Sequence, residues 1–253
     1  MASLLSRFIR ANRALCARLE PHLPQARLNI SLHYELTVAE HMRRLTPGSI
    51  VVDAGGGRKC CYAEYKPEGI EIVAADVSGE ELSLNKEADR GVVADVSTRL
   101  PFADSSVDIV TSKHLLEHLP DISRFVAESH RVLKPGGLFA SLLPSRYALF
   151  AILSRLLPDS ARENLVHRLV AETDETHRFH TYYDRCYAGA LEHVLVDAGF
   201  EIVELVPGYY GAGYFSFSFP LWLAVVGWEL ATMLFGCRNL AASVMVAARK
   251  RTS

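Results

Sequence analysis

The chain has 253 residues, 49% of them hydrophobic and 22% charged, with 29 acidic side chains against 27 Lys and Arg. This balance excludes a collagen, a low-complexity linker and an intrinsically disordered tail. A net charge of −2 argues against a protein that binds nucleic acid through bulk charge, so we expect no nucleic-acid partner. The mean hydropathy of +0.11 is high for a soluble enzyme and calls for a local explanation.

The cysteines indicate a reducing compartment. They form no CxxC pair and leave an odd one over, so a disulfide framework is disfavoured. We therefore expect reduced thiols in a cytoplasmic protein. The five are Cys16, Cys60, Cys61, Cys186 and Cys237.

Residues 1–20 form a basic amphipathic pattern with four Arg and one Glu, and lack the apolar core and cleavage site of a signal peptide. Apolar side chains recur at helical spacing at Leu4, Leu5, Phe8, Ala11, Leu15 and Leu19. We expect residues 1–46 to be an N-terminal helical segment. Its first helix either packs on the domain, which we favour, or lies on an anionic membrane surface.

From Ser49 onward, short apolar runs alternate with helical stretches. The pattern predicts strands at 49–55, 70–78, 91–96, 106–112, 137–145, 201–208 and 243–250, and helices at 59–65, 80–88, 122–133 and 182–198. Such alternation is typical of a parallel sheet covered on both faces. We therefore predict a doubly wound α/β domain over 47–253, with helical insertions at about 145–181 and 209–240.

A glycine turn follows the first predicted strand, which ends VVDAGGGRK and contains Asp53, Gly55, Gly56 and Gly57. Consecutive glycines let the backbone turn sharply and approach a ligand closely. A dinucleotide fingerprint would need glycine at Cys60, and no P-loop follows this strand. The turn alone is therefore weak evidence for any one ligand.

Acidic residues end the second and third predicted strands as well, at Asp76 and Asp95. Aspartate often caps helices after strands, so each acid alone has an ordinary structural explanation. In a parallel sheet, however, the carboxyl ends of the strands meet at one edge, where ligands bind. Three acids in register predict a nucleoside-containing ligand, with Asp76 placed to hold a ribose diol.

The ordered segments VVDAGGG, AADVS, ADVSTRLPFADSSVDIV, SKHLLEHLPD and RVLKPGGLF extend this pattern over 47–137. Together they resemble the class I S-adenosylmethionine-dependent methyltransferases, in particular the type 11 and quinone-methyltransferase-like branch. The resemblance implies a Rossmann-like seven-stranded sheet with an antiparallel last strand. It also implies S-adenosylmethionine as cofactor and S-adenosylhomocysteine as product.

The resemblance further implies roles for individual residues. Asp76 would hold the ribose, Asp95 would border the adenine, and the glycine turn supported by Asp53 would line the methionine moiety. Lys59 departs from the family pattern, which has glycine there, so the far end of the turn is open to remodelling. The cofactor set is Asp53, Ala54, Gly55, Gly56, Gly57, Asp76, Val77, Asp95, Val96, Ser112 and Lys113.

Methyl transfer to a hydroxyl needs a group that removes its proton near neutral pH. Candidates are His114 and His118 beside the cofactor, and His177, His180 and Tyr182 in the first insertion. The insertion cluster is equally compatible with a polar helix N-terminus. The pentad from His114 to His118 also spells an inverted zinc-protease motif, but it follows a parallel strand and is cut short by a proline, so we expect no metal.

A long apolar stretch at 214–235 carries only one charged residue, Glu229. Its length suits a marginal membrane span, but strands of one sheet are predicted on both sides of it, so the chain has to return to the side it left. It is therefore a buried helix, a dimer surface or a helix lying in one leaflet. The aromatic residues that suit a headgroup boundary are Tyr209, Tyr210, Tyr214, Trp222 and Trp228.

The leading hypothesis is a methyltransferase acting on an oxygen or carbon atom of a lipophilic or lipid-linked small molecule. It would touch the cytoplasmic face of a membrane through 1–20 and 214–235. One alternative is a methyltransferase of a soluble secondary metabolite, with the apolar stretch as a lid or homodimer face. Another is a non-catalytic protein that binds the cofactor and assembles with partners, although the intact acids argue against lost binding.

Overall fold

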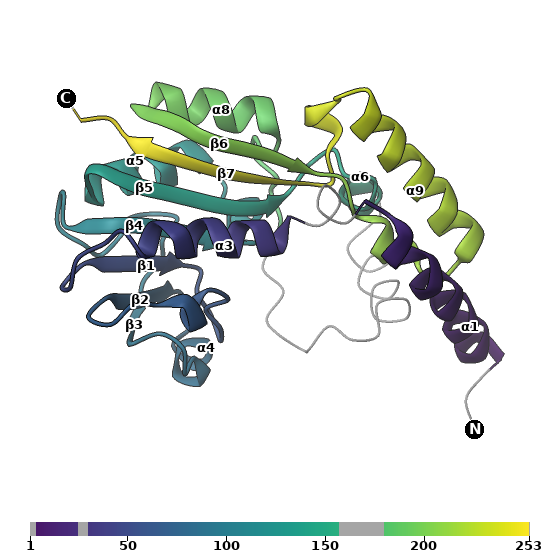
Figure 1. Cartoon of the computed structure of the whole chain (residues 1–253), viewed down its shortest axis with the longest axis horizontal. Coiled ribbons are helices and arrows are strands. Elements are labelled where there is room, and N and C mark those ends of the chain that lie inside the picture. Colours follow the sequence, from purple (N-terminus) through teal and green to yellow (C-terminus); the bar gives the residue numbers. More distant parts are fainter. Residues whose placement is uncertain (1–3, 25–29, 157–179, 253) are drawn as a thin grey trace.

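The computed structural model describes residues 4–24, 30–156 and 180–252. Within them a seven-stranded sheet has the order β3-β2-β1-β4-β5-β7-β6 (Figure 1). The strands are β1 (Ile50–Ala54), β2 (Glu71–Asp76), β3 (Arg90–Val93), β4 (Val107–Lys113), β5 (Leu133–Pro144), β6 (Phe200–Gly208) and β7 (Ser243–Lys250). Neighbours from β3 across to β5 pair in parallel, and β7 is antiparallel to both β5 and β6. The predicted α/β sheet with an antiparallel last strand is confirmed.

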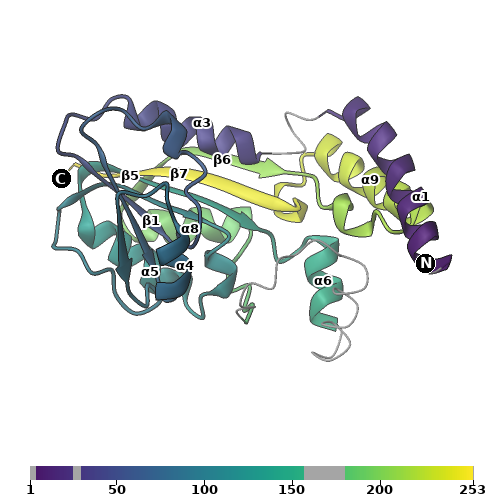
Figure 2. The same ribbon diagram turned by 90° about the horizontal axis from the view of Figure 1, so that it is seen from below.

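Helices cover both faces of this sheet (Figure 2). Helix α3 (Ser31–Met42) lies on one face, and α5 (Ile122–Val132) and α8 (Ala188–Asp197) lie on the other. Each face buries its own apolar cluster, and for this reason the central strands read as continuous runs of Val, Ile and Ala. Phe139 of β5 packs between Phe125 and Phe200, with ring centroids 6.2 and 5.8 Å away.

Two predicted helices are shorter in the structure because side chains accept hydrogen bonds from backbone amides within the predicted ranges. The helix predicted at 59–65 is a single 3-10 turn, η2 (Ala63–Tyr65), because the Cys60 amide donates to a carboxylate oxygen of Glu87 at 2.6 Å. Helix α4 (Gly79–Leu84) ends before 88 because the Asn85 side chain turns back toward the glycine turn.

The helix predicted at 182–198 begins only at Ala188. The amides of Tyr182 and Tyr183 donate instead to the Glu117 carbonyl oxygen, at 2.8 and 3.1 Å. These bonds hold the preceding segment in an extended form against the loop after β4.

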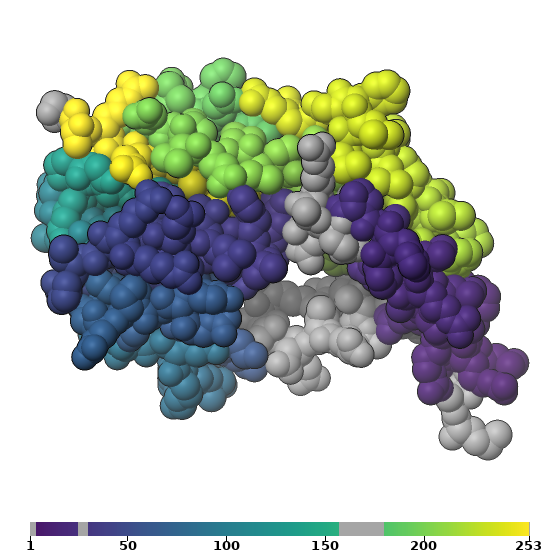
Figure 3. All heavy atoms as spheres, viewed as in Figure 1, coloured from purple at the N-terminus to yellow at the C-terminus, as the bar shows by residue number. Residues whose placement is uncertain are grey.

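Helices α1 (Leu4–Leu19), α6 (Leu149–Leu156) and α9 (Phe219–Leu234) lie beyond the carboxyl ends of the parallel strands (Figures 1 and 2). The space-filling view shows α1 along the outside of the molecule, next to α9 (Figure 3). Within the described residues, no helix combines the length and apolar composition needed to span a bilayer.

Helix α1 packs on α9 through a face that its apolar spacing does not indicate. Asn12 is 7% exposed; its Oδ1 accepts from the Phe219 amide at 2.8 Å, and its Nδ2 donates to the Phe8 carbonyl at 2.9 Å. Cys16 is the other buried residue of this face. The face of α1 that was predicted to be buried is exposed instead. The side-chain amide of Asn12 faces α9 because it pairs with the Phe219 N–H at the start of that helix, and a leucine in its place would leave this N–H without a partner.

The buried face of helix α9 contains both apolar and polar side chains. Trp222, Val225 and Val226 are buried in a cluster with Cys16. Tyr209 and Trp222 are therefore core residues, which corrects the prediction that they flank a headgroup boundary.

Glu229 is the buried charge of α9. It is 7% exposed, and its Oε1 accepts from the Gly211 amide at 2.8 Å. Burial raises the pKa of this carboxyl from 4.5 to about 7. Between these two values the folded chain binds more protons than the unfolded chain, so this group makes folding less stable as pH rises.

We expect Glu229→Gln to raise the free energy of unfolding by about 1–3 kcal/mol at pH 8, because the neutral amide keeps the bond from Gly211 without a buried charge. At pH 5 the variant and the parent should differ little. Urea unfolding at both pH values measures this, with exposed Glu201→Gln as control. Equal destabilisation at both pH values would show that packing, not charge, decides the effect.

Candidate functional site

Backbone amides of the glycine turn after β1 are hydrogen-bonded to the end of β2. Gly55 has a φ of +71°, and its amide donates to the Ala75 carbonyl at 2.8 Å. A Cβ at Gly56 would lie 2.9 Å from the Asp53 carbonyl oxygen, so no larger residue fits without movement. The Gly57 amide donates to Asp76 Oδ2 at 3.1 Å, which ties the turn to the end of β2.

A buried polar cluster supports this turn from beneath. Thr111 lies beside Asp53 in the sheet register, and its hydroxyl is 3.0 Å from Asp53 Oδ1 and 2.5 Å from the Tyr62 hydroxyl. Asp53 is 5% exposed, and its burial raises the pKa of its carboxyl to about 6. Asp53 thus lies under the turn, outside the lining of the cavities described next.

A cavity of about 480 Å³ opens at the carboxyl ends of β2, β3 and β4. It is lined by Gly55, Asp76, Val77, Ala94, Asp95, Val96, Ser97, His114, Leu115, His118, Leu119, Pro120, His180 and Tyr182. Most of the acids and histidines predicted from the sequence therefore meet here. Residues that the sequence did not indicate are Ala94, Ser97, Leu115, Leu119 and Pro120, which lie next to predicted ones along the chain.

Six predicted cofactor residues do not line this cavity: Asp53, Ala54, Gly56, Gly57, Ser112 and Lys113. The Ser112 hydroxyl is buried 2.8 Å from that of Ser141. The Lys113 ammonium donates to Glu35 on α3 at 3.0 Å. Their side chains therefore serve the sheet and its covering helix.

The two carboxylates in the cavity are fixed by backbone amides. Asp76 Oδ1 accepts from the Ser78 amide at 2.8 Å while Oδ2 accepts from Gly57. Asp95 Oδ1 accepts from the Ser97 amide at 2.9 Å. Each carboxylate has spare lone pairs, so both can still accept from hydroxyl or amino groups of a ligand.

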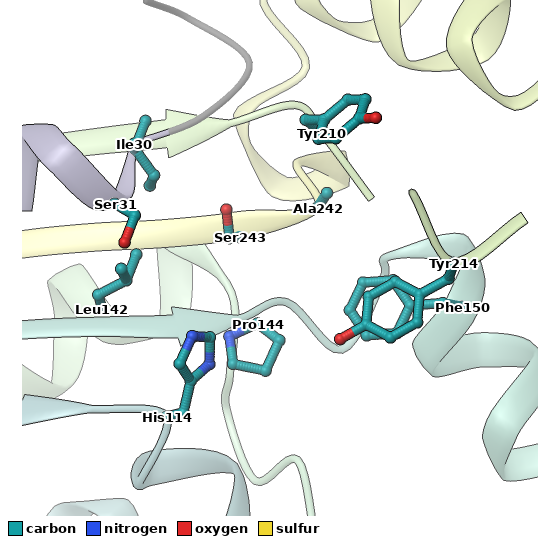
Figure 4. A pocket seen from close by; sticks show the side chains of 10 residues that line it. All are labelled: Ile30, Ser31, His114, Leu142, Pro144, Phe150, Tyr210, Tyr214, Ala242 and Ser243. Atoms are coloured by element: carbon teal, nitrogen blue, oxygen red, sulfur yellow. The ribbon is translucent and has the colours of Figure 1, made fainter. Parts of the chain in front are cut away.

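A second cavity of about 250 Å³ adjoins the first and is mostly apolar and aromatic (Figure 4). Its walls come from five separate stretches of the chain: Ile30, Ser31, His114, Leu142, Pro144, Phe150, Tyr210, Tyr214, Ala242 and Ser243. The rings of Phe150 and Tyr214 stack with centroids 4.2 Å apart. Sequence reasoning noticed Tyr210 and Tyr214 only as flanking aromatics and missed this cavity, since its walls are far apart along the chain.

His114 lines both cavities. Its φ of +57° is uncommon for a residue other than glycine, and its amide donates to the Leu142 carbonyl at 2.8 Å. A non-glycine residue keeps this conformation only when its surroundings enforce it, often at a functional site. Strand pairing here holds the backbone and directs the imidazole to the junction of the cavities.

Glu117 lies between the histidines of the pentad and is 4% exposed. Its Oε1 is 3.7 Å from His114 Nδ1 and 3.9 Å from His118 Nε2. In the described part of the chain, no three His, Cys, Asp or Glu side chains are grouped to hold a metal ion.

The other predicted histidines differ in position. His118 Nδ1 lies 3.0 Å from the carbonyl oxygen of His180, so the first insertion meets the loop after β4 at this point. His180 and Tyr182 line the larger cavity. His177 lies outside the described residues.

The sheet order, the glycine turn and the acids at the strand ends define a Rossmann-like domain of the class I type. Residues 50–141 match the family model described as a methyltransferase domain. This part of the chain is therefore a class I S-adenosylmethionine-dependent methyltransferase domain, as the sequence predicted.

Curated relatives agree over the same region. An uncharacterized methyltransferase of Mycobacterium sp. (strain JLS) is 40% identical over 96 residues, covering 37% of this chain and 38% of the relative. The demethylmenaquinone methyltransferase of Corynebacterium glutamicum is 34% identical over 125 residues, covering 47% and 54%. The chain thus spans 38% to 54% of the length of these relatives.

Solved structures share the fold at low sequence identity. Geranyl diphosphate C-methyltransferase from Streptomyces coelicolor has a TM-score of 0.56 at 15% identity, covering 87% of this chain and 80% of that one. A putative methyltransferase from Bacillus halodurans has a TM-score of 0.53 at 19% identity, covering 88% and 99%.

We expect Thr111→Val to lower the free energy of unfolding by about 1–3 kcal/mol, because buried Asp53 and Tyr62 lose a hydrogen-bonding partner of the same shape. Urea unfolding at pH 7 measures the loss. Thr46→Val on the exposed surface is the matched control. Equal stability of the two variants would mean that the cluster beneath the turn contributes nothing to folding.

Proposed function

We propose that this protein binds S-adenosylmethionine in the 480 Å³ cavity and transfers its methyl group to an oxygen or carbon atom of a lipophilic small molecule in the 250 Å³ cavity. The observation that carries the proposal is that His114 lines both cavities. A methyl donor and its acceptor need adjoining sites with one shared wall, since in-line transfer depends on positioning.

The larger cavity fits the cofactor. Asp76, fixed by two backbone amides, would accept from the ribose hydroxyls. Asp95 and Val96 would border the adenine, and Gly55 lets the backbone approach the methionine moiety. Lys59 stands where the family pattern has glycine, and the next amide, that of Cys60, donates to a carboxylate oxygen of Glu87 at 2.6 Å.

The smaller cavity favours a lipophilic acceptor. Its walls are largely aliphatic and aromatic, with the hydroxyls of Ser31 and Ser243 among them. The Phe150 and Tyr214 rings offer a flat surface to a planar or prenyl-like group (Figure 4). The relative from C. glutamicum is named for a quinone substrate, which supports this class of acceptor.

The chain's own groups supply positioning and proton transfer. Bound S-adenosylmethionine would provide the electrophilic methyl group. His114 would take the proton from an acceptor hydroxyl, because a ring nitrogen of a neutral imidazole can accept a proton. Buried Glu117, 3.7 Å from His114 Nδ1, would stabilise the resulting imidazolium. His118 and His180 would then shape the cofactor cavity without contacting the acceptor.

We expect Gly56→Ala to weaken S-adenosylmethionine binding at least tenfold, because the added Cβ would meet the Asp53 carbonyl oxygen at 2.9 Å and shift the turn. Isothermal titration calorimetry measures this directly. In Gly227→Ala the added Cβ meets no atom within 4 Å, so this control should bind normally. Normal binding by both variants would contradict the placement of the cofactor.

We expect His114→Asn to lower kcat by about 100-fold or more while the cofactor Kd changes less than about threefold, because the base is lost but the cavity persists. Asparagine tolerates the positive φ at this position. The assay follows methyl transfer to a panel of quinols, phenols and polyprenyl-linked sugars. Exposed His193→Asn is the control.

Full turnover in His114→Asn would exclude this histidine as the base and direct attention to His118 and His180. Cofactor binding without turnover on any acceptor in the parent chain would favour the non-catalytic alternative.

A further inference from the structure

The outward face of α9 is entirely uncharged. The one charged residue of this helix, Glu229, is buried. Outward side chains include Leu223 and Trp228; the helix ends at Leu234, which is 80% exposed, and Phe235 follows it with 84% exposed. A contiguous apolar surface of this kind usually marks a contact with another molecule or a membrane.

Helix α1 adds a second apolar surface with positive charge beside it. Leu4, Phe8 and Leu15 recur along one stripe and are exposed. Arg7 and Arg18 are exposed on the same helix, and residues 4–19 contain no acid. An exposed apolar stripe next to arginines is typical of helices that lie in an anionic lipid interface.

Both surfaces lie at the same end of the molecule, away from the C-terminus (Figures 1 and 3). Asn12 joins the two helices by its bond to the first amide of α9. The loop between β6 and α9 supplies Tyr210 and Tyr214 to the wall of the smaller cavity. This end of the molecule is therefore the one nearest the proposed acceptor site.

We propose that this end, formed by the outward face of α9 and the exposed stripe of α1, docks on an anionic phospholipid bilayer. The leucines and aromatic rings would enter the boundary between headgroups and acyl chains, and the arginines would pair with lipid phosphates. Helix α9 has 16 residues, about 24 Å at ~1.5 Å per residue, so it would lie in the interface and not cross it.

Charge distinguishes a bilayer from a second copy of the chain. In a twofold contact through these helices, the arginines of one α1, such as Arg7 and Arg18, would meet the same basic surface of the second copy, and α1 offers no carboxylate to pair with them. Arg238, just after α9, is already paired with Glu192 at 2.7 Å. An anionic surface compensates these charges, whereas a symmetric copy adds to them.

Docking would bring a lipid-borne acceptor to the smaller cavity. This link rests on the proposed function, whereas bilayer binding itself does not. The two are measured separately, because vesicle binding needs neither cofactor nor acceptor.

The test is vesicle flotation with the full chain, using phosphatidylcholine vesicles with and without phosphatidylglycerol. We expect binding to the anionic vesicles, and its loss when Leu234→Glu and Phe235→Glu are combined. Both positions are exposed, so folding should be kept, and thermal unfolding verifies this. Val196→Glu, at an exposed apolar position on α8, should bind like the parent.

A second pair of variants tests the charge. Arg7→Gln with Arg18→Gln should weaken binding to anionic vesicles at least tenfold, since each arginine near such a surface contributes about fivefold. Arg43→Gln with Arg124→Gln removes the same charge from exposed sites elsewhere and should have little effect. High salt should reduce the difference.

Two results would overturn the proposal. One is a folded parent chain that does not float with anionic vesicles. The other is a dimer, seen by analytical ultracentrifugation without lipid, that the Leu234→Glu and Phe235→Glu combination separates while vesicle binding is absent. In that case the surface would be an interface between copies. Methyl transfer to detergent-solubilised acceptors would be unaffected by either result.

Discussion

The parallel register of β1, β2, β3 and β4 is the constraint on which the site depends. Pairing Ala54 with Ala75 and with Ser112 aligns the strands so that their carboxyl ends stop at one level. Acids and turns separated by long stretches of chain are thereby brought to a single edge. The middle of each strand can therefore stay apolar, because the ligand-facing groups come from the last residue of a strand, such as Asp76, or from the turn that follows it.

Hydrogen bonds of buried polar side chains then fix how neighbouring elements are positioned, which apolar packing alone does not determine. Thr111 sits opposite Asp53 in that register, so the hydroxyl reaches the carboxylate beneath the glycine turn. At the far end of the molecule, Asn12 and Glu229 act similarly, each accepting from a backbone amide that would otherwise be buried without a partner. Apolar surfaces could slide past one another, whereas these bonds allow one arrangement.

The strands and the acids at their ends could be predicted from the sequence, because both depend on patterns among neighbouring residues. Residues 243–250 were predicted as a strand and form β7 with the same bounds, and Asp76 and Asp95 line the larger cavity. The smaller cavity could not be predicted, since it joins the start of α3 to segments near 150, 210 and 242. The positive φ of His114 could not be predicted either, because it is imposed by pairing with β5 and not by the residues next to His114 in the sequence.

The high mean hydropathy of the chain is explained in part by apolar side chains that α1 and α9 expose. In an ordinary surface helix, apolar residues mark the buried face, and this rule predicted that the leucines of α1 would pack inward. The structure buries Asn12 and exposes Leu4 and Leu15 instead. Helix α9 likewise buries its one charged residue, Glu229, and exposes Leu234. Both helices thus bury a polar side chain at their inner contact and leave large apolar side chains exposed, with arginines beside them on α1. Water alone does not favour exposed apolar surface, which an apolar partner would stabilise.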